Sequence, residues 1–414
     1  MTTADRLAPL PTPRSIRSRV AGGRVARALV ARAVRDVPVR VRYPDGSVLG
    51  GGGTGSPVIE VRDPSALHRR LEAHPKIGLG EGFMAGEWGV SPDTDLADAL
   101  APFAARLATI LPAPLLRLRG LVDRALPHAD RNTRSGSRTN IEAHYDLSND
   151  LFATFLDPSM AYSSALFDDT LPWAEQDLER AQDRKVQAAL DAARVTQDSR
   201  VLEIGSGWGA LAIAAARRGA LVTTITLSRE QQVEAIDRVR AAGLADRVEV
   251  QLCDYRDVDG EYDAVVSIEM IEAVGEEYWP TYMETIDRVL APGGVAVVQA
   301  ILMSHDRFLA TRNSYGWIQK YIFPGGLIPS VDALRDAAER HTSLRLTHIR
   351  PFGAHYAETL RRWRHTFEEQ WPAVAALGFD ETFRRMWTYY LAYSEAGFRS
   401  GYLDVAHLTL ERNR

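Results

Sequence analysis

The chain has 414 residues, of which 45% are hydrophobic and 25% are charged, and its formal net charge is −5. These values are ordinary for a globular protein of about two domains, and the absence of any apolar run of about eighteen residues excludes a typical transmembrane helix. The N-terminus lacks the pattern of a secretory signal. Cys253 is the single cysteine, so we expect a cytoplasmic protein with no internal disulfide and no bound metal.

A basic segment begins the first predicted domain, residues 1–128. Between residues 14 and 42, nine arginines are opposed by one acidic residue, Asp36. Apolar residues interleave with them over residues 14–36, which predicts a basic amphipathic helix. Such a helix suits an anionic membrane surface, where each arginine adds about 1 kcal/mol of attraction; the alternative is an ordinary solvated helix face. No nucleic-acid-binding signature accompanies the charge, so nucleic acid is not an expected partner.

Short elements complete this domain. Residues 38–43 alternate valine and arginine before a turn at 44–46, which predicts a hairpin. A further strand is predicted at 58–61, and helices at 65–73 and 96–111. A polar segment rich in Ser, Arg and Gly follows, and we place a linker within it at 129–139.

Helices and strands alternate in the second predicted domain, residues 140–414. The predicted strands are 201–204, 221–227, 248–252, 264–268 and 295–301, and the predicted helices are 180–194, 210–218, 233–242 and 278–290. This alternation predicts an α/β fold with a parallel, doubly wound, Rossmann-like sheet, beside a smaller N-terminal domain. Ligands of such sheets bind at the carboxyl ends of the strands.

The first of these strands ends in a glycine-rich turn. Glu203 closes the strand, and Gly205, Gly207 and Gly209 follow with the spacing G-x-G-x-G. Glycines allow a close approach of ligand to backbone, and the following helix offers free N–H groups. Because this spacing is shorter than the dinucleotide form, it favours an adenosine ligand without a pyrophosphate. S-adenosylmethionine is the leading candidate, and a plain strand–helix turn is the alternative.

Polar residues follow the next two strands. No acidic ribose ligand stands at the usual position, but Thr226 and Gln231 can bond a ribose without adding charge. Asp254 and Tyr255 suit adenine, through a hydrogen bond to its amino group and a ring against its face. Each residue alone is compatible with a surface loop, whereas their recurrence at successive strand ends predicts a cofactor site.

Two carboxylates and many aromatic rings suggest what this site acts on. Glu269 and Glu272 follow the fourth strand and suit a sulfonium or a developing cation. Sixteen aromatic residues lie between Trp317 and Tyr402. Aromatic side chains over helices are usually core, but here they could also line an apolar cavity for a lipid and stabilise a carbocation.

Several motifs resemble the cyclopropane-fatty-acid synthase family. They are residues 144–152 (HYDLSNDLF), 156–158 (LDP), 160–164 (MAYSS), 202–209 (LEIGSGWG), 226–228 (TLS), 320–326 (KYIFPGG), 328–330 (IPS), 355–356 (HY) and 359–360 (TL). The resemblance spans about residue 140 to the C-terminus, and the preceding region resembles the extra domain of the phospholipid-acting members. The resemblance implies a class I methyltransferase fold. It also implies a protein that associates peripherally with the inner membrane surface and that is often a homodimer.

The resemblance also implies a reaction and its residues. S-adenosylmethionine methylates a cis double bond in a phospholipid acyl chain, and a bound bicarbonate removes a proton from the resulting carbocation. The catalytic and bicarbonate-holding positions are Ser164, Glu272, Gln299, Ile301 and Tyr356. The cofactor positions are Tyr162, Ser163, Glu203, Gly205, Gly207, Thr226, Leu227, Gln231 and Tyr255, to which the adenine argument adds Asp254.

Departures from the family pattern bear on the product. The family commonly has cysteine at Ser164, Ser206 and Ser394, so a thiol mechanism is excluded. It commonly has histidine at Ala273 and at Gln299; glutamine can hydrogen-bond bicarbonate but cannot take a proton, which leaves bicarbonate binding open. Residues 268–275 and 299–301 resemble the actinobacterial branch that makes 10-methylene and 10-methyl fatty acids.

We therefore expect a 10-methylene product, formed after a hydride shift, which a separate reductase could convert into a methyl branch. A cyclopropane product is the alternative. A small-molecule methyltransferase and a non-catalytic lipid-binding protein are weaker alternatives, the latter because the glycine turn is intact.

Overall fold

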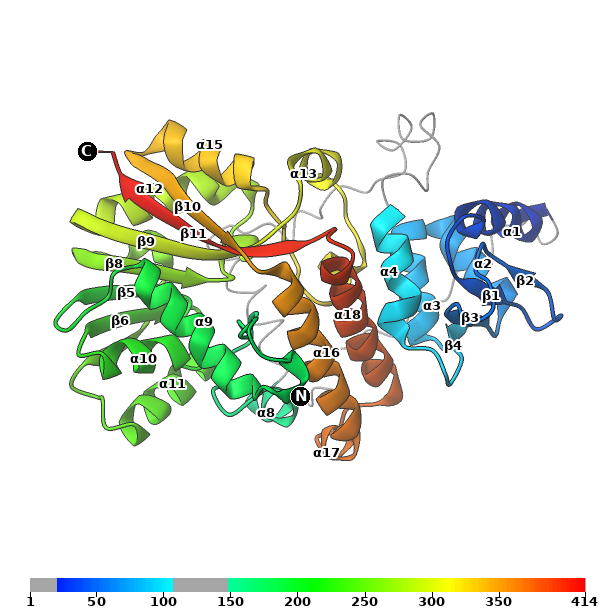
Figure 1. The fold of residues 1–414 in the computed structure, drawn as a ribbon, viewed down its shortest axis with the longest axis horizontal. Coiled ribbons are helices and arrows are strands. Elements are labelled where there is room, and N and C mark those ends of the chain that lie inside the picture. Colours follow the sequence, from blue (N-terminus) through cyan, green and yellow to red (C-terminus); the bar gives the residue numbers. More distant parts are fainter. Residues whose placement is uncertain (1–20, 107–147, 414) are drawn as a thin grey trace. The chain divides into compact units, whose positions relative to one another are not determined.

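A computed structural model describes residues 21–106 and 148–413 (Figure 1). Four predicted segments lie outside the described residues. They are the start of the basic helix at 14–20, the end of a second helix at 107–111, the linker at 129–139 and the start of a family motif at 144–147. The chain divides into two compact units. The first comprises Met1–Ala125, Ser314–Ile322 and Leu360–Tyr402, and the second comprises Leu126–Asn313, Phe323–Thr359 and Leu403–Arg414.

The first unit combines a small sheet with helices. Its elements are α1 (Ala21–Val34), β1 (Arg40–Arg42), β2 (Val48–Leu49), β3 (Val58–Val61), α2 (Pro64–Ala73), α3 (Pro75–Met84), β4 (Trp88–Val90), α4 (Leu96–Arg106), α14 (Trp317–Tyr321), the second part of α16 (Gly353–Glu369), α17 (Trp371–Ala376) and α18 (Glu381–Arg399). The sheet order is β2-β1-β3-β4, with the predicted hairpin formed by β1 and β2. Helix α3 and strand β4 are not predicted by the sequence.

Two segments from the C-terminal half belong to this first unit, although the sequence predicts them in the second domain. Contacts with buried charges hold both of them in place. Glu81 of α3 accepts hydrogen bonds from Lys320 Nζ at 2.6 Å and from the Tyr321 hydroxyl at 2.7 Å. Arg364 Nη2 pairs with Asp95 at 2.8 Å and with Glu395 at 2.9 Å. The contacts of Glu81 with Lys320 and Tyr321, and of Arg364 with Asp95, join residues more than 200 positions apart, which no local pattern predicts.

Part of the aromatic-rich region is packed core of the first unit. Trp363, Phe367, Phe383 and Trp387 have no exposed surface. Phe383 and Trp387 stack with ring centroids 5.5 Å apart. For these four side chains, core packing is the correct interpretation, rather than the lining of a lipid cavity.

The second unit is built on a seven-stranded sheet. Its elements are α8 (Asn149–Phe155), α9 (Leu178–Ala192), β5 (Arg200–Ile204), α10 (Ala210–Arg217), β6 (Leu221–Thr226), α11 (Arg229–Ala241), β7 (Val248–Leu252), β8 (Tyr262–Ile268), α12 (Trp279–Val289), β9 (Leu290–Leu302), α13 (His305–Thr311), α15 (Val331–His341), β10 (Leu344–Pro351), the first part of α16, and β11 (Asp404–Arg412), with short 3₁₀ turns at Trp173–Glu175, Tyr255–Asp257, Ile271–Ala273 and Glu276–Tyr278. The strand order is β10-β11-β9-β8-β5-β6-β7.

The predicted strands β5 to β9 are parallel to one another, as expected. The expectation of a fully parallel sheet is wrong, because β11 runs antiparallel to both β9 and β10. Strand β11 enters the sheet after the long helix α18, and neither β10 nor β11 is predicted by the sequence. The sheet is therefore mixed, with the doubly wound arrangement of helices that the sequence predicts.

Helices cover both faces of this sheet: α9, α10 and α11 lie on one face, and α12 and α15 on the other (Figure 1). Successive residues of a strand point to opposite faces. Val201 accordingly packs in the core beneath α9 and α10, and Leu202 in the core beneath α12 and α15. Because both cores are apolar, the polar groups of the strands concentrate at the strand ends.

Candidate active site

The glycine turn after β5 has the backbone conformation that glycine favours. Gly205, Gly207 and Gly209 have φ values of 98°, 49° and 90°, which other L-residues rarely adopt. A Cβ on Gly205 would lie 2.4 Å from Cγ of Met270. The N–H groups of Gly205 and Ser206 both donate to the carbonyl of Ile225, each at 3.0 Å. The turn therefore stays close to β6.

The predicted cofactor residues before β5 are linked to this turn by aromatic packing. The ring of Phe152 lies 5.1 Å from Tyr162 and 5.1 Å from Trp208 of the turn. Trp208 Nε1 also donates to Asn149 Oδ1 at 2.8 Å. The segment that carries Tyr162 and Ser163 is thus held against the turn.

Glu203 is the acidic residue at the end of β5, and it is 3% exposed. Its Oε2 lies 2.6 Å from the hydroxyl oxygen of Thr224, which is also 2.7 Å from the hydroxyl oxygen of Ser206. Burial raises the pKa of Glu203 to about 8. A cationic ligand group beside it would favour the ionised form.

The remaining predicted cofactor residues lie at the end of β6, which is next to β5, and after β7, which is next to β6. Thr226 donates to Gln231 Oε1 at 3.0 Å, which turns the amide nitrogen of Gln231 away from it, and Leu227 follows directly. Both oxygens of Asp254 accept from Arg256, at 2.8 and 2.6 Å, so its carboxylate already has a partner. Tyr255 is buried edge-to-face against another tyrosine ring. Adenine binding by Asp254 and Tyr255 stays a prediction.

A carboxylate surrounded by donors lies at the end of β8. Glu269 Oε1 accepts from the backbone N–H of Ser164 at 2.9 Å and from Gln299 Nε2 at 2.7 Å. Its Oε2 accepts from the hydroxyl of Tyr356 at 2.7 Å. Burial raises the pKa of Glu269, and these three hydrogen bonds and the charge of Lys185 oppose the rise. Three residues assigned to bicarbonate therefore converge on a carboxylate of the chain itself.

A second carboxylate lies beside the first. Glu272 Oε1 accepts from the backbone N–H of Ile301, whereas Oε2 is buried and has no hydrogen-bond partner among the described residues. Burial, and then the charge of Glu269, raise the pKa of Glu272 to about 8. The five predicted catalytic residues are thus brought together, but Ser164 and Ile301 contribute main-chain groups rather than side chains.

Two side chains that the sequence reasoning missed support this cluster. His407 Nε2 lies 2.9 Å from Gln299 Oε1, so His407 donates, and burial lowers its pKa to about 3. The two residues are direct partners in the β9–β11 pairing. Lys185 is 2% exposed, and its Nζ donates to the hydroxyl of Ser163 at 2.6 Å. The one available signal was a lysine on the apolar face of a predicted amphipathic helix.

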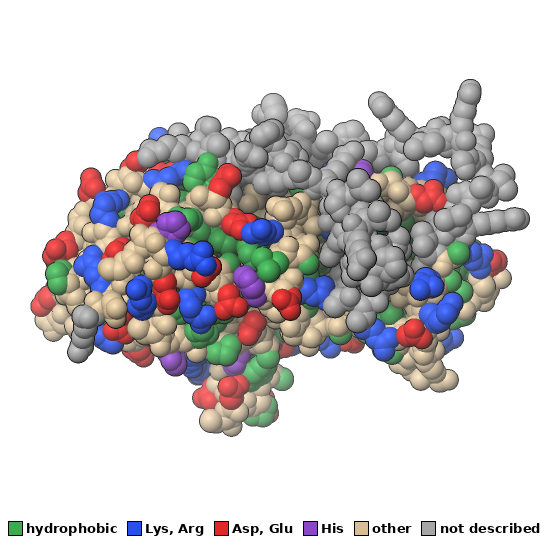
Figure 2. Space-filling view, turned by 90° about the horizontal axis from the view of Figure 1, so that it is seen from above, with side chains coloured by type: hydrophobic (Ala, Val, Ile, Leu, Met, Phe, Trp, Pro, Cys, Tyr) green, Lys and Arg blue, Asp and Glu red, His purple; other side chains and the backbone are tan. Residues whose placement is uncertain are grey.

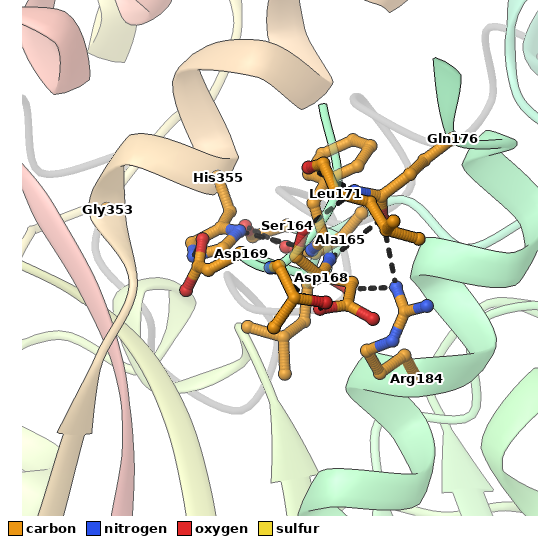
Figure 3. A network of polar contacts seen from close by, with 12 residues as sticks. Ser164, Ala165, Asp168, Asp169, Leu171, Gln176, Arg184, Gly353 and His355 are labelled. Carbon is orange, nitrogen blue, oxygen red and sulfur yellow. Dashed lines mark hydrogen bonds and ion pairs between the residues drawn. The ribbon is translucent and has the colours of Figure 1, made fainter. Parts of the chain in front are cut away.

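The segment that follows Ser164 is fixed by side chains from two helices (Figure 3). Ala165 N–H donates to Thr359 Oγ1 and Phe167 N–H donates to His355 Nδ1, both at 3.1 Å, and both acceptors belong to α16. Arg184 of α9 donates to the carbonyl of Leu166 at 3.1 Å. These bonds hold the main chain around Ser164, and so its N–H, in position toward Glu269.

Known proteins resemble this chain over most of its length. Residues 132–408 match the family model of mycolic acid cyclopropane synthetases. The chain is 49% identical over 397 residues to the tuberculostearic acid methyltransferase UfaA1 of Mycobacterium tuberculosis, covering 95% of this chain and 92% of the relative. It is 33% identical over 368 residues to the cyclopropane-fatty-acyl-phospholipid synthase of Escherichia coli, covering 86% and 87%.

Solved structures give the same result. The mycolic acid cyclopropane synthase CmaA1 complexed with SAH and CTAB superposes with a TM-score of 0.60 at 28% identity, covering 69% of this chain and 99% of that one. The cyclopropane synthase MmaA2 from Mycobacterium tuberculosis gives a TM-score of 0.61 at 27% identity, covering 69% and 98%. The chain therefore belongs to the mycolic acid cyclopropane synthetase family and is an enzyme that uses S-adenosylmethionine.

Proposed function

We propose that the enzyme transfers a methyl group from S-adenosylmethionine to a cis double bond in the acyl chain of an unsaturated phospholipid, and that the product is a 10-methylene acyl group. The names of two relatives support an acyl substrate, since one is a tuberculostearic acid methyltransferase and another a cyclopropane-fatty-acyl-phospholipid synthase. The bound methyl donor supplies an electrophilic carbon. The residues of the chain must position the alkene, stabilise the carbocation and remove a proton.

The acidic cluster suits the second of these tasks. When the alkene attacks the methyl group, the positive charge moves to a carbon atom of the acyl chain. A fixed carboxylate in a desolvated site stabilises such a charge much more than it would in water. Glu269 is that carboxylate in our proposal, because three donors stabilise its ionised form.

The main support for a methylene product is that the side chains of the acidic cluster and its neighbours accept a proton poorly. Gln299 cannot take a proton, and His407, with a pKa near 3, is a very weak base. Proton transfer to Glu269 must compete with the three hydrogen bonds that stabilise its charge. Slow proton loss gives time for a hydride to shift and convert a secondary cation into a tertiary one. Proton loss from the new methyl group then yields a methylene group instead of a ring.

The product can be identified directly. The purified enzyme is incubated with methyl-labelled S-adenosylmethionine and liposomes of a cis-monounsaturated phospholipid, and the recovered acyl chains are analysed by proton NMR. Exomethylene signals are expected. High-field cyclopropyl signals would contradict the proposed product but retain the acyl substrate. Unmethylated lipid, with the cofactor bound normally, would contradict the phospholipid substrate. A methyl branch would require a separate reductase.

We propose further that the N-terminal region associates with the membrane surface. Within residues 21–106 and 148–413, no helix has the length and apolar character needed to cross a membrane. Arg27 of α1 is engaged with Asp45 and Ser47, but Arg32 and Arg35 are exposed. Acidic and basic side chains are interspersed on the face seen in Figure 2, so binding would depend on α1 and the segment before it. Cosedimentation with anionic liposomes, reduced by Arg32→Glu with Arg35→Glu, tests this.

A further inference from the structure

The family resemblance implies a bicarbonate ion, and the geometry around Glu269 does not fit one. An anion site needs donors that no other acceptor uses. Here Ser164 N–H, Gln299 Nε2 and the Tyr356 hydroxyl all donate to the Glu269 carboxylate, at 2.7 to 2.9 Å. A second anion at the same donors would have to displace this carboxylate and would stand beside its negative charge. The chain thus supplies its own anion where the resemblance places an external one.

The backbone at Glu269 is in a strained conformation. Glu269 has φ 52°, a left-handed conformation that non-glycine residues rarely adopt. Its N–H donates to the carbonyl of Gln299 at 2.8 Å, which fixes the end of β8 against β9. Strained residues of this kind persist where the surrounding structure determines them, commonly at active sites. The strain and the three donors are independent indications of a functional carboxylate.

The two glutamates have different surroundings, which separates their roles. Burial raises the pKa of Glu269, but its three donors and the charge of Lys185 oppose this and favour the anion. Glu272 has one oxygen without a partner among the described residues, and the charge of Glu269 raises its pKa further, to about 8. Two adjacent carboxyl groups with different surroundings divide acid and base roles. We assign the negative charge of the pair to Glu269 and a proton to Glu272 near neutral pH.

We propose that Glu269 is the catalytic base of the reaction and that the enzyme works without bicarbonate. The electron pair of a C–H bond in the transferred methyl group moves to the cationic carbon, as the second bond of the methylene double bond or as the closing bond of a cyclopropane, and the proton moves to Glu269. A carboxylate has about four acceptor positions, and three are occupied, so Oε2 retains one for this proton. The proposal rests on the proposed carbocation chemistry but not on which product forms.

The first test uses the unmodified enzyme. Transfer of label from S-adenosylmethionine into lipid is measured in carbon dioxide-depleted buffer, with and without added sodium bicarbonate. Label transfer is counted whatever the product, so a cyclopropane product would contradict the proposed function without affecting this test. We expect equal rates in the two buffers. A rate that falls at least tenfold on depletion and returns with bicarbonate would overturn the proposal.

The second test is chemical rescue. Glu269→Gly removes the carboxylate at a φ that glycine accepts, and leaves its three donors to a small anion. We expect label transfer to fall about 10²- to 10⁴-fold, the usual contribution of a general base, and bicarbonate or formate to restore it at least tenfold. Activity of this variant within threefold of wild type in depleted buffer would overturn the proposal. Glu277→Ala, which removes an exposed carboxylate nearby, is the matched control.

Discussion

Replacing Lys185 with methionine should weaken cofactor binding through the amino-acid part of the cofactor. Lysine can only donate hydrogen bonds, so the hydroxyl of Ser163, 2.6 Å away, must accept. The proton of that hydroxyl is then directed away from Lys185 and is available to an acceptor. Since Ser163 belongs to the segment predicted to bind the cofactor, we expect that acceptor to be the α-carboxylate of S-adenosylmethionine.

The expected size of the effect follows from the kind of interaction that is lost. A hydrogen bond that involves a charged group contributes about 1.5–3 kcal/mol, which corresponds to a change in Kd of ~10- to 100-fold. Methionine has nearly the same length and fills the same buried volume, so the packing of α9 is retained. Because burial lowers the pKa of Lys185 to about 8, the ammonium is lost above that pH, and wild-type affinity should fall there.

Isothermal titration with two ligands measures this effect. S-adenosylhomocysteine contains the α-carboxylate, and 5′-methylthioadenosine lacks the amino-acid part. Lys185→Met should weaken binding of the first ligand ~10- to 100-fold and change binding of the second less than threefold. Equal losses for the two ligands would show that the substitution disturbs the fold and would refute the reasoning. An unchanged affinity for both would refute it as well. Lys76→Met, at an exposed position, is the control.

Three further predictions concern the same unit. His407→Leu removes the donor that orients the amide of Gln299. We expect turnover to fall about tenfold with cofactor affinity unchanged, and His407→Gln to recover part of the lost turnover. Unchanged turnover in the leucine variant would contradict this role. The pKa of Glu203 is raised to about 8, so the folded state keeps a proton that the unfolded chain loses above about pH 4.5. Stability should therefore decline as the pH rises between those two values. Glu203→Gln should flatten the decline of Tm with pH, and parallel Tm curves for the variant and the wild type would exclude this contribution of Glu203. Gly205→Ala should lower both Tm and cofactor affinity through the φ of 98° and the clash with Met270, and adding Met270→Ala should relieve only the clash; full recovery in the double variant would show that φ does not matter.

The strands and the glycine turn of the second unit could be predicted because their signals are local. Val201 and its neighbours form a short apolar run, and the glycines that follow have φ values that their sequence spacing suggests. The parallel pairing of β5 to β9 was also predictable, from the alternation of strands and helices. Strand β11 was not, because its position depends on pairing with β9, more than 100 residues earlier in the chain.

The candidate site was predictable as a set of strand ends but not as a set of contacts. Glu269 and Glu272 are three residues apart and look equivalent in sequence, yet one receives three donors and the other a single backbone N–H. That difference arises from Tyr356 and Gln299, which come from other elements. Lys185 and His407 were missed because a buried charge or imidazole has no distinguishing pattern until its partner is placed.

The donors around Glu269 come from the segment after α8, from β9 and from α16. One of them, the N–H of Ser164, is present whatever side chain stands at that position. All three donors therefore belong to parts of the chain other than the end of β8, which carries their acceptor. A change of one residue at the end of β8 could exchange an internal acceptor for a dissolved ion, and a family built on this sheet could alter its chemistry without rebuilding its active site.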